Sequence, residues 1–167
     1  MNSKVLTIRP FLQAEERAQD FFDMADRAFK YGSPWSLEQF SETLVRTDLI
    51  FFVAEQNKRL LGYIGGQLLG EEAELYLLVV DPPHHQQQVA SQLMEAYKSW
   101  CISEGVKLIF LEVRASNNRA RRFYSKQGFS EIASRKQYYT KPAEDAIIMK
   151  CTIGKKDQHV IKKNISN

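Results

Sequence analysis

The sequence predicts an α/β protein built on one mixed β-sheet with helices on both faces. A strand, a helix and a second strand follow one another between Leu75 and Val113, which is the pattern of a right-handed parallel crossover. Upstream, short turns join three apolar strands, Leu49–Glu55, Leu60–Leu69 and Glu72–Val80, and predict an antiparallel meander. The full expected order is β-α-α-β-β-β-α-β-α-β-β, with a central parallel pair of strands.

The N-terminal part supplies the first strand and two helices. Val5–Arg9 alternates apolar and polar residues, which indicates a strand. Apolar residues recur at helical spacing through Ala14–Phe29, and Gly32-Ser33-Pro34 breaks that helix. Ser36 then caps a second helix, because Gln39 stands at the capping-box position.

The C-terminal part alternates helices and strands. Gly65-Gly66 in the second meander strand predicts a bulge or a close backbone approach, since no helix follows that could make it a phosphate loop. Two glycines, Gly105 and Gly128, mark helix ends. The expected elements after the meander are the helix Val89–Ser103, the strand Leu108–Val113, a short helix carrying Phe123 and Tyr124, and the strands Phe129–Tyr139 and Ala146–Thr152.

The composition is typical of one globular domain. The chain has 167 residues, of which 44% are hydrophobic and 26% charged, and this length is sufficient for a hydrophobic core. We expect a single domain over residues 1–153 and a basic polar tail over 154–167. Four lysines and one aspartate in the tail account for the net charge of +3. Both a solvated terminus and a weak contact with RNA or ribosomes fit such a tail.

Several classes of protein are excluded by composition. No apolar run approaches the ~20 residues of a membrane helix, and the first residues contain no apolar signal segment, so we expect a cytoplasmic protein with no membrane partner. Cys101 and Cys151 lie in apolar surroundings and are expected to be buried free thiols. With three histidines and no Cys/His cluster, no metal site is expected. A monomer and a homodimer both remain open.

Glu112 and Tyr124 form the most informative pair in the chain. Glu112 interrupts an otherwise apolar strand, and Tyr124 follows twelve residues later on the next helix. Strand alternation places Leu111 and Val113 on one face and Glu112 on the other, so that Glu112 points into a cleft if its neighbours face the core. A carboxylate and a phenol in this arrangement are suited to accepting and donating protons.

Five segments carry a family resemblance. Together they run from about residue 5 to 152, and they resemble the GNAT N-acetyltransferases, in particular the bacterial ribosomal-protein-alanine N-acetyltransferases of the RimI type. The segments are Ser33-Pro34-Trp35-Ser36, Val79-Val80-Asp81-Pro82, Leu111 to Asn117 (LEVRASN), Phe123-Tyr124 through Gly128-Phe129, and Arg135 to Tyr139 (RKQYY) followed by Glu144 to Met149 (EDAIIM).

The resemblance implies the GNAT acyl-CoA N-acyltransferase fold and acetyl transfer from acetyl-CoA, the co-substrate, to a protein N-terminal α-amine. The N-terminal alanine of a small-subunit ribosomal protein is a candidate acceptor. The amine would attack the thioester directly, with Glu112 as general base and Tyr124 as general acid. The residues implied in cofactor binding are Leu78, Val79, Val80, Gln86, Gln87, Gln88, Val89, Ala90, Ser91, Asn117 and Tyr124.

The pyrophosphate loop departs from the family pattern Gln/Arg-x-x-Gly-x-Gly/Ala. The corresponding residues are His85 to Ala90, of which only Ala90 fits, and Gln88 replaces the glycine. A non-glycine residue costs ~1–2 kcal/mol where the backbone must be left-handed, so we expect weaker cofactor binding. Protonated His84 and His85 could supply positive charge to the loop, and exposed histidines without that role are the alternative.

Other readings of the sequence stay open. A GNAT enzyme acting on a lysine or on a small-molecule amine is one alternative, and a non-catalytic GNAT-fold interaction module with a degenerate loop is another. The cluster Arg119, Arg121 and Arg122 is either a solvated helix face or a contact for phosphate or an acidic partner. Glu144 and Asp145 are candidates for binding a cationic acceptor.

Overall fold

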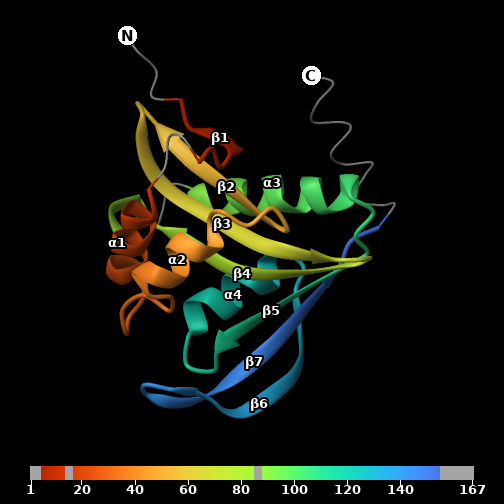
Figure 1. Cartoon of the computed structure of the whole chain (residues 1–167). Helices are drawn as coiled ribbons and strands as arrows, with labels where there is room; N and C mark the ends of the chain where they lie inside the picture. Colours follow the sequence, from red (N-terminus) through yellow and green to blue (C-terminus); the bar gives the residue numbers. More distant parts are fainter. Residues whose placement is uncertain (1–4, 14–16, 85–87, 155–167) are drawn as a thin grey trace. The chain divides into compact units, whose positions relative to one another are not determined.

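The computed structural model describes residues 5–13, 17–84 and 88–154 (Figure 1), and the chain divides into two compact units. The first unit comprises Met1–Gln67 and Leu77–Tyr97, and the second comprises Leu68–Tyr76 and Lys98–Asn167. The elements are β1 (Thr7–Pro10), α1 (Ala18–Ala28), α2 (Leu37–Thr43), β2 (Leu49–Gln56), β3 (Arg59–Leu69), β4 (Glu72–Val80), the 3-10 turn η1 (Pro82–His84), α3 (Val89–Ser103), β5 (Leu108–Arg114), α4 (Asn118–Lys126), β6 (Ser130–Thr140) and β7 (Ala143–Thr152). This order confirms the predicted fold class. Whether 1–153 forms a single domain stays a prediction, and the tail beyond Gly154 lies outside the described residues.

In the first unit, the strands follow the order β1-β2-β3-β4, and the β1-β2 and β2-β3 pairs are antiparallel. The prediction that the first strand ends before Pro10 was wrong, because Pro10 is paired with Phe52. β1 is an edge strand, where the missing N–H of proline removes no necessary ladder bond. After β4, the Asp81 amide donates to the Leu61 carbonyl at 2.8 Å, which fixes the start of the following loop.

Helices α1 and α2 follow their predicted signals in part. The capping box of α2 is confirmed: the Ser36 hydroxyl accepts from the Gln39 amide at 3.1 Å, and the Gln39 side chain accepts from the Ser36 amide at 2.8 Å. The predicted start of α1 at Ala14 was too early. Arg17 is extended, with φ −114° and ψ 143°, so the helix begins at Ala18, and residues 14–16 lie outside the described residues.

An aromatic cluster forms the core of the first unit. Phe21, Phe40 and Tyr63 are fully buried, and the Tyr63 hydroxyl donates to the Phe21 carbonyl at 2.8 Å. Phe51 explains why a glycine is needed in β3, because a Cβ on Gly65 would lie 2.2 Å from the Phe51 ring. Of the two predictions for Gly65-Gly66, the close approach is therefore the one observed at Gly65.

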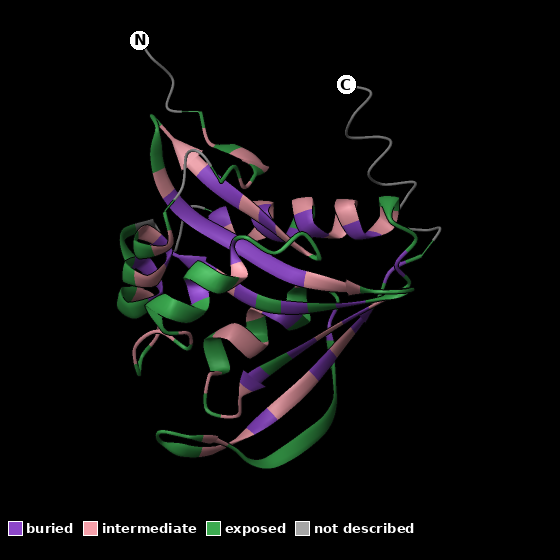
Figure 2. Cartoon of the chain, viewed as in Figure 1, coloured by how far each residue is buried: buried purple, intermediate pink, exposed green. Residues whose placement is uncertain are grey.

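The second unit holds the strand order β4-β5-β7-β6 (Figure 1). The predicted parallel pair is confirmed, since Glu72 pairs with Leu108 in parallel register, while β5-β7 and β7-β6 are antiparallel. Cys101 and Cys151 are buried free thiols, as predicted. Burial alternates along β5, whereas nearly all of β6 is exposed (Figure 2).

Two irregularities distinguish β6 from a regular edge strand. One falls between Glu131 and Ala133, and the other between Arg135 and Tyr139. Across the second, Arg135 faces Ala146 and Tyr139 faces Glu144, so three residues of β6 stand opposite the single Asp145. Bulges of this kind re-aim side chains and are common beside functional sites.

Candidate active site

β5 presents Glu112 on the face opposite to its buried neighbours. Leu111 and Val113 are 4% and 6% exposed, while the Glu112 side chain is 31% exposed. The predicted alternation is therefore confirmed. A carboxylate held on a strand between two buried anchors has a fixed backbone position and remains accessible to water and to small groups.

Two side chains from β6 hold the Glu112 carboxylate. Arg135 Nη1 lies 2.9 Å from Glu112 Oε1 and donates a hydrogen bond to it. Hydrogen bonding with the Glu112 side chain, more than partial burial, raises the pKa of Tyr138. The Arg135 guanidinium lies 5.4 Å from the centre of the Tyr138 ring. The Glu112 carboxylate therefore has two partners on β6, Arg135 and Tyr138.

Sequence reasoning assigned no role to Arg135 or Tyr138. Their segment carried the family resemblance, but strand alternation alone places residues three apart on opposite faces. Arg135 and Tyr138 reach the same carboxylate because the second irregularity of β6 lies between them. The signal that could have found them is the charged and aromatic RKQYY run on a strand with no apolar face.

Tyr124 lies on α4, whose two ends are both fixed. Asn117 is the N-cap, and its side chain accepts from the Ala120 amide at 3.2 Å. Gly128, with φ +92°, ends the segment in the left-handed conformation that favours glycine. Asn117 therefore has a structural role, whether or not it also contacts the cofactor.

The Tyr124 phenol is buried in an aromatic environment. Its ring contacts Phe123 and Phe129, with centres 5.5 and 5.7 Å away, and its residue is 9% exposed. Burial, and to a smaller extent Tyr139, raise the pKa of Tyr124 above its usual value. Within the described ranges, no hydrogen bond to its hydroxyl is found. Tyr124 therefore keeps its proton at neutral pH and has that proton available for donation.

Tyr139 interacts with both candidate catalytic groups. Burial, followed by the charge of Glu112, raises the pKa of Tyr139 to about 12, and Tyr139 in turn contributes to the raised pKa of Tyr124. The Arg114 guanidinium lies 4.2 Å from the Tyr139 ring centre. Glu112, Tyr124 and Tyr139 therefore belong to one electrostatic neighbourhood within the second unit.

Glu144 and Asp145, predicted as candidates for acceptor binding, have partners inside the second unit. Glu144 accepts from the Ser116 amide at 2.6 Å and pairs with Arg114 at 3.2 Å. Asp145 accepts from the Gln137 amide at 2.8 Å and pairs with Lys136 at 3.2 Å. These contacts stabilise the turn after β5 and the irregular part of β6, so both carboxylates support the site's shape.

The predicted cofactor residues of the first unit lie at the end of β4 and the start of α3. Val79, Val80 and Val89 are buried, and Leu78, Ala90 and Ser91 are partly exposed. Gln88 has φ +59°, so it does take up the left-handed conformation that a glycine adopts easily. Gln86, Gln87 and His85 lie outside the described residues, as does the His84 side chain.

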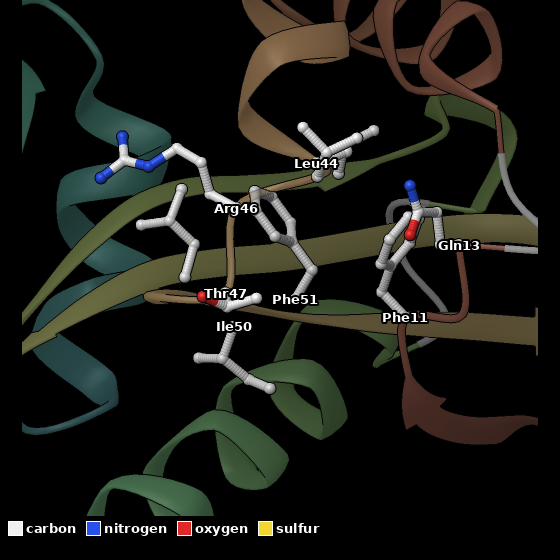
Figure 3. Close-up of a pocket in the computed structure, with 9 residues that line it drawn as sticks. Phe11, Gln13, Leu44, Arg46, Thr47, Ile50 and Phe51 are labelled. Carbon is white, nitrogen blue, oxygen red and sulfur yellow. The ribbon is translucent and has the colours of Figure 1, made fainter.

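A separate pocket of about 250 Å³ lies in the first unit (Figure 3). Its lining includes Phe11, Leu44 and Phe51 together with the polar residues Gln13, Arg46 and Thr47. None of the predicted site residues lines it. In the part of the chain that the structure describes, no group of three or more His, Cys, Asp or Glu could hold a metal ion, and no helix is long and apolar enough to cross a membrane.

Comparisons with known proteins identify the family of the chain. The acetyltransferase (GNAT) family matches residues 14–129. An Escherichia coli ribosomal protein bS18-alanine N-acetyltransferase is 36% identical over 70% of the chain and 79% of the relative. A Bacillus subtilis protein provisionally given the same name is 31% identical over 75% and 84%. The crystal structure of an Escherichia coli ribosomal-protein-S18-alanine N-acetyltransferase superposes with a TM-score of 0.80 at 30% identity, covering 90% of this chain and 95% of that one.

Proposed function

The chain belongs to the GNAT acetyltransferase family, and on that premise we propose that it acetylates the N-terminal α-amine of a protein, with acetyl-CoA as donor. The observation that carries this proposal is the accessible Glu112 carboxylate in the same unit as the buried, protonated Tyr124. We propose the N-terminal alanine of ribosomal protein bS18 as the acceptor, because the Escherichia coli relative is named for that substrate.

Glu112 acts in this proposal as the general base. An α-ammonium group has a pKa of ~7.7–8.0, so much of the acceptor is protonated at neutral pH and cannot attack a thioester. A carboxylate has about four lone-pair sites. Arg135 and Tyr138 occupy part of this capacity, which leaves room for the amine or for one bridging water. Glu112 can therefore take the proton whose removal makes the amine nucleophilic.

Tyr124 acts as the donor to the departing thiolate. An alkyl thiol such as cysteine has a pKa of ~8.5, which is lower than that of an ordinary phenol. Since burial raises the pKa of Tyr124 further, complete proton transfer from it is uphill. The hydrogen bond from Tyr124 is then the main stabilisation of the thiolate as charge develops, in the manner of an oxyanion-hole donor.

The start of α3 fits the cofactor that the family uses. Acetyl-CoA supplies the activated thioester when bound. The first amides of a helix have no intrahelical partner, and the helix dipole favours anions there, so the amides of residues 88–91 are suited to phosphate oxygens. The first turn of α3 contains no acidic residue that would oppose such binding. Leu78 to Val80 would line the same cofactor from the end of β4.

Mass spectrometry can test the acceptor assignment. The protein would be incubated with acetyl-CoA and a peptide that has a free N-terminal alanine and an internal lysine. We expect acetylation at the α-amine and none on the same peptide with a blocked N-terminus. Preferred turnover of the lysine or of a small-molecule amine would contradict the acceptor assignment. Absence of both turnover and acetyl-CoA binding would favour a non-catalytic interaction module.

A further inference from the structure

The proposed base already carries a cationic partner. Arg135 Nη1 lies 2.9 Å from the Glu112 carboxylate, at hydrogen-bond distance, and the two side chains are 54% and 31% exposed. Ion pairs exposed to this extent are weak, because water and salt screen them and the long arginine side chain loses freedom in forming them. The pair is therefore formed but can be broken easily.

The acceptor must bring a second cation to the same carboxylate. Its α-ammonium is positively charged before it delivers its proton, and like charges at one carboxylate repel each other. We propose that Arg135 is a specificity-determining residue, which occupies Glu112 between turnovers and is replaced there by the ammonium of the acceptor. This inference depends on the proposed role of Glu112 as the base.

The surroundings of Arg135 allow it to leave while the carboxylate stays in place. Glu112 also interacts with the Tyr138 side chain, so the carboxylate keeps a second partner when the guanidinium departs. The guanidinium lies 5.4 Å from the Tyr138 ring centre, which offers a cation–π contact close to its present position. β6 is exposed around Arg135, so solvent can receive the displaced side chain (Figure 2).

The replacement is consistent with the balance of protons in the reaction. The bound ammonium gives one proton to Glu112, and the neutral amine attacks the thioester carbon. The nitrogen loses a second proton as the amide forms, and the thiolate that leaves gains one, so one proton is released per turnover. Return of Arg135 to Glu112 favours the carboxylate and thereby expels that proton to water. A blocked N-terminus carries no charge, so it cannot displace Arg135.

Calorimetry on the full chain saturated with CoA provides the test. The titrants are a peptide with a free N-terminal alanine and the same peptide N-acetylated, at low ionic strength. Arg135→Gln should bind the free-amine peptide about 2- to 5-fold more tightly than wild type, because a weak competitor is gone. Its affinity for the acetylated peptide should not change. Arg135→Lys retains the positive charge and should resemble wild type.

Lys136→Gln is the matched control, since it removes one positive charge from the adjacent residue, whose partner is Asp145. Equal tightening by Lys136→Gln, or equal tightening toward the acetylated peptide, would overturn the inference by revealing a general charge effect. Unchanged or weaker binding of the free-amine peptide by Arg135→Gln would overturn it as well. If wild type acetylates the peptide, only the role of Arg135 then fails. If wild type neither binds nor acetylates the peptide, the proposed function fails and this inference falls with it.

Discussion

Replacement of Gln88 by glycine should stabilise the folded protein. Gln88 has φ +59°, a conformation that costs an L-residue ~1–2 kcal/mol relative to the right-handed region. Glycine removes this cost, but it also raises the conformational entropy of the unfolded chain. That increase destabilises the folded state by ~0.4–1 kcal/mol. At the middle of both ranges, the net gain in the free energy of unfolding is about 0.8 kcal/mol. With an m-value of ~2 kcal/mol/M, the urea midpoint should rise by about 0.3–0.5 M.

Equilibrium urea unfolding followed by circular dichroism and by tryptophan fluorescence would measure this gain. Gln88→Ala is the matched control, because it removes the side chain but keeps the Cβ and so keeps the strain. Gln88→Asn should lie between the two, since asparagine tolerates the left-handed region better than most residues. If glycine is no more stabilising than alanine, the backbone at this position is not strained and the reasoning is refuted.

The same substitution separates strain from cofactor affinity. We expect the loop to keep the φ of +59° at Gln88 when the cofactor binds, so that the strain is the same before and after binding. Any weakening of acetyl-CoA binding by Gln88 would then come from its side chain. We therefore expect Gln88→Gly and Gln88→Ala to change the acetyl-CoA dissociation constant equally, although only the former raises stability. A lower acetyl-CoA dissociation constant for Gln88→Gly, with no such change for Gln88→Ala, would show that the loop changes conformation on binding.

Three further substitutions test other parts of the structure. Tyr124→Phe should lower kcat by ~10²–10⁴-fold while leaving Tm nearly unchanged, since the ring contacts remain; a large fall in Tm would assign the hydroxyl a structural role. Gly65→Ala should destabilise the fold by ~1–3 kcal/mol in urea unfolding, because its Cβ would overlap the buried Phe51 ring, and an unchanged midpoint would contradict the close approach. The Ser116 hydrogen bonds, and then Arg114, hold the pKa of Glu144 below its usual value. The stability that Glu144 contributes is therefore present above its unfolded pKa of ~4.3 and is lost as pH falls through the folded pKa. Glu144→Gln should lower Tm at neutral pH by an amount that shrinks in acid, and a pH-independent difference would exclude this linkage.

Local sequence signals predicted much of the fold because local interactions determine those features. The capping box at Ser36 and Gln39 involves two side chains and two amides within one turn, so its residues can be recognised directly in the sequence. The alternation that exposes Glu112 depends only on the pleat of β5. The start of α1 was predicted too early because helical spacing does not show where the chain becomes extended, as it is at Arg17.

The partners of Glu112 could not be predicted in the same way. Arg135 is 23 residues away along the chain, and it meets Glu112 only because β6 pairs with β7 and β7 with β5. Tyr138 reaches the same carboxylate through an irregularity in β6 that periodicity does not reveal. Tertiary pairing and strand bulges thus decide the electrostatics of the site, whereas the sequence pattern decides which residues are available for it.

The turnover rate of Glu112→Gln on an alanine-terminated peptide tests the central claim most directly. The matched control is Glu131→Gln, which removes a carboxylate of β6 that also pairs with an arginine, in this case Arg121 at 2.7 Å. We predict that Glu112→Gln lowers kcat by ~10²–10⁴-fold at unchanged Tm and that Glu131→Gln stays near wild type. Turnover by Glu112→Gln at the wild-type rate would contradict the account, because Glu112 would then not be the base.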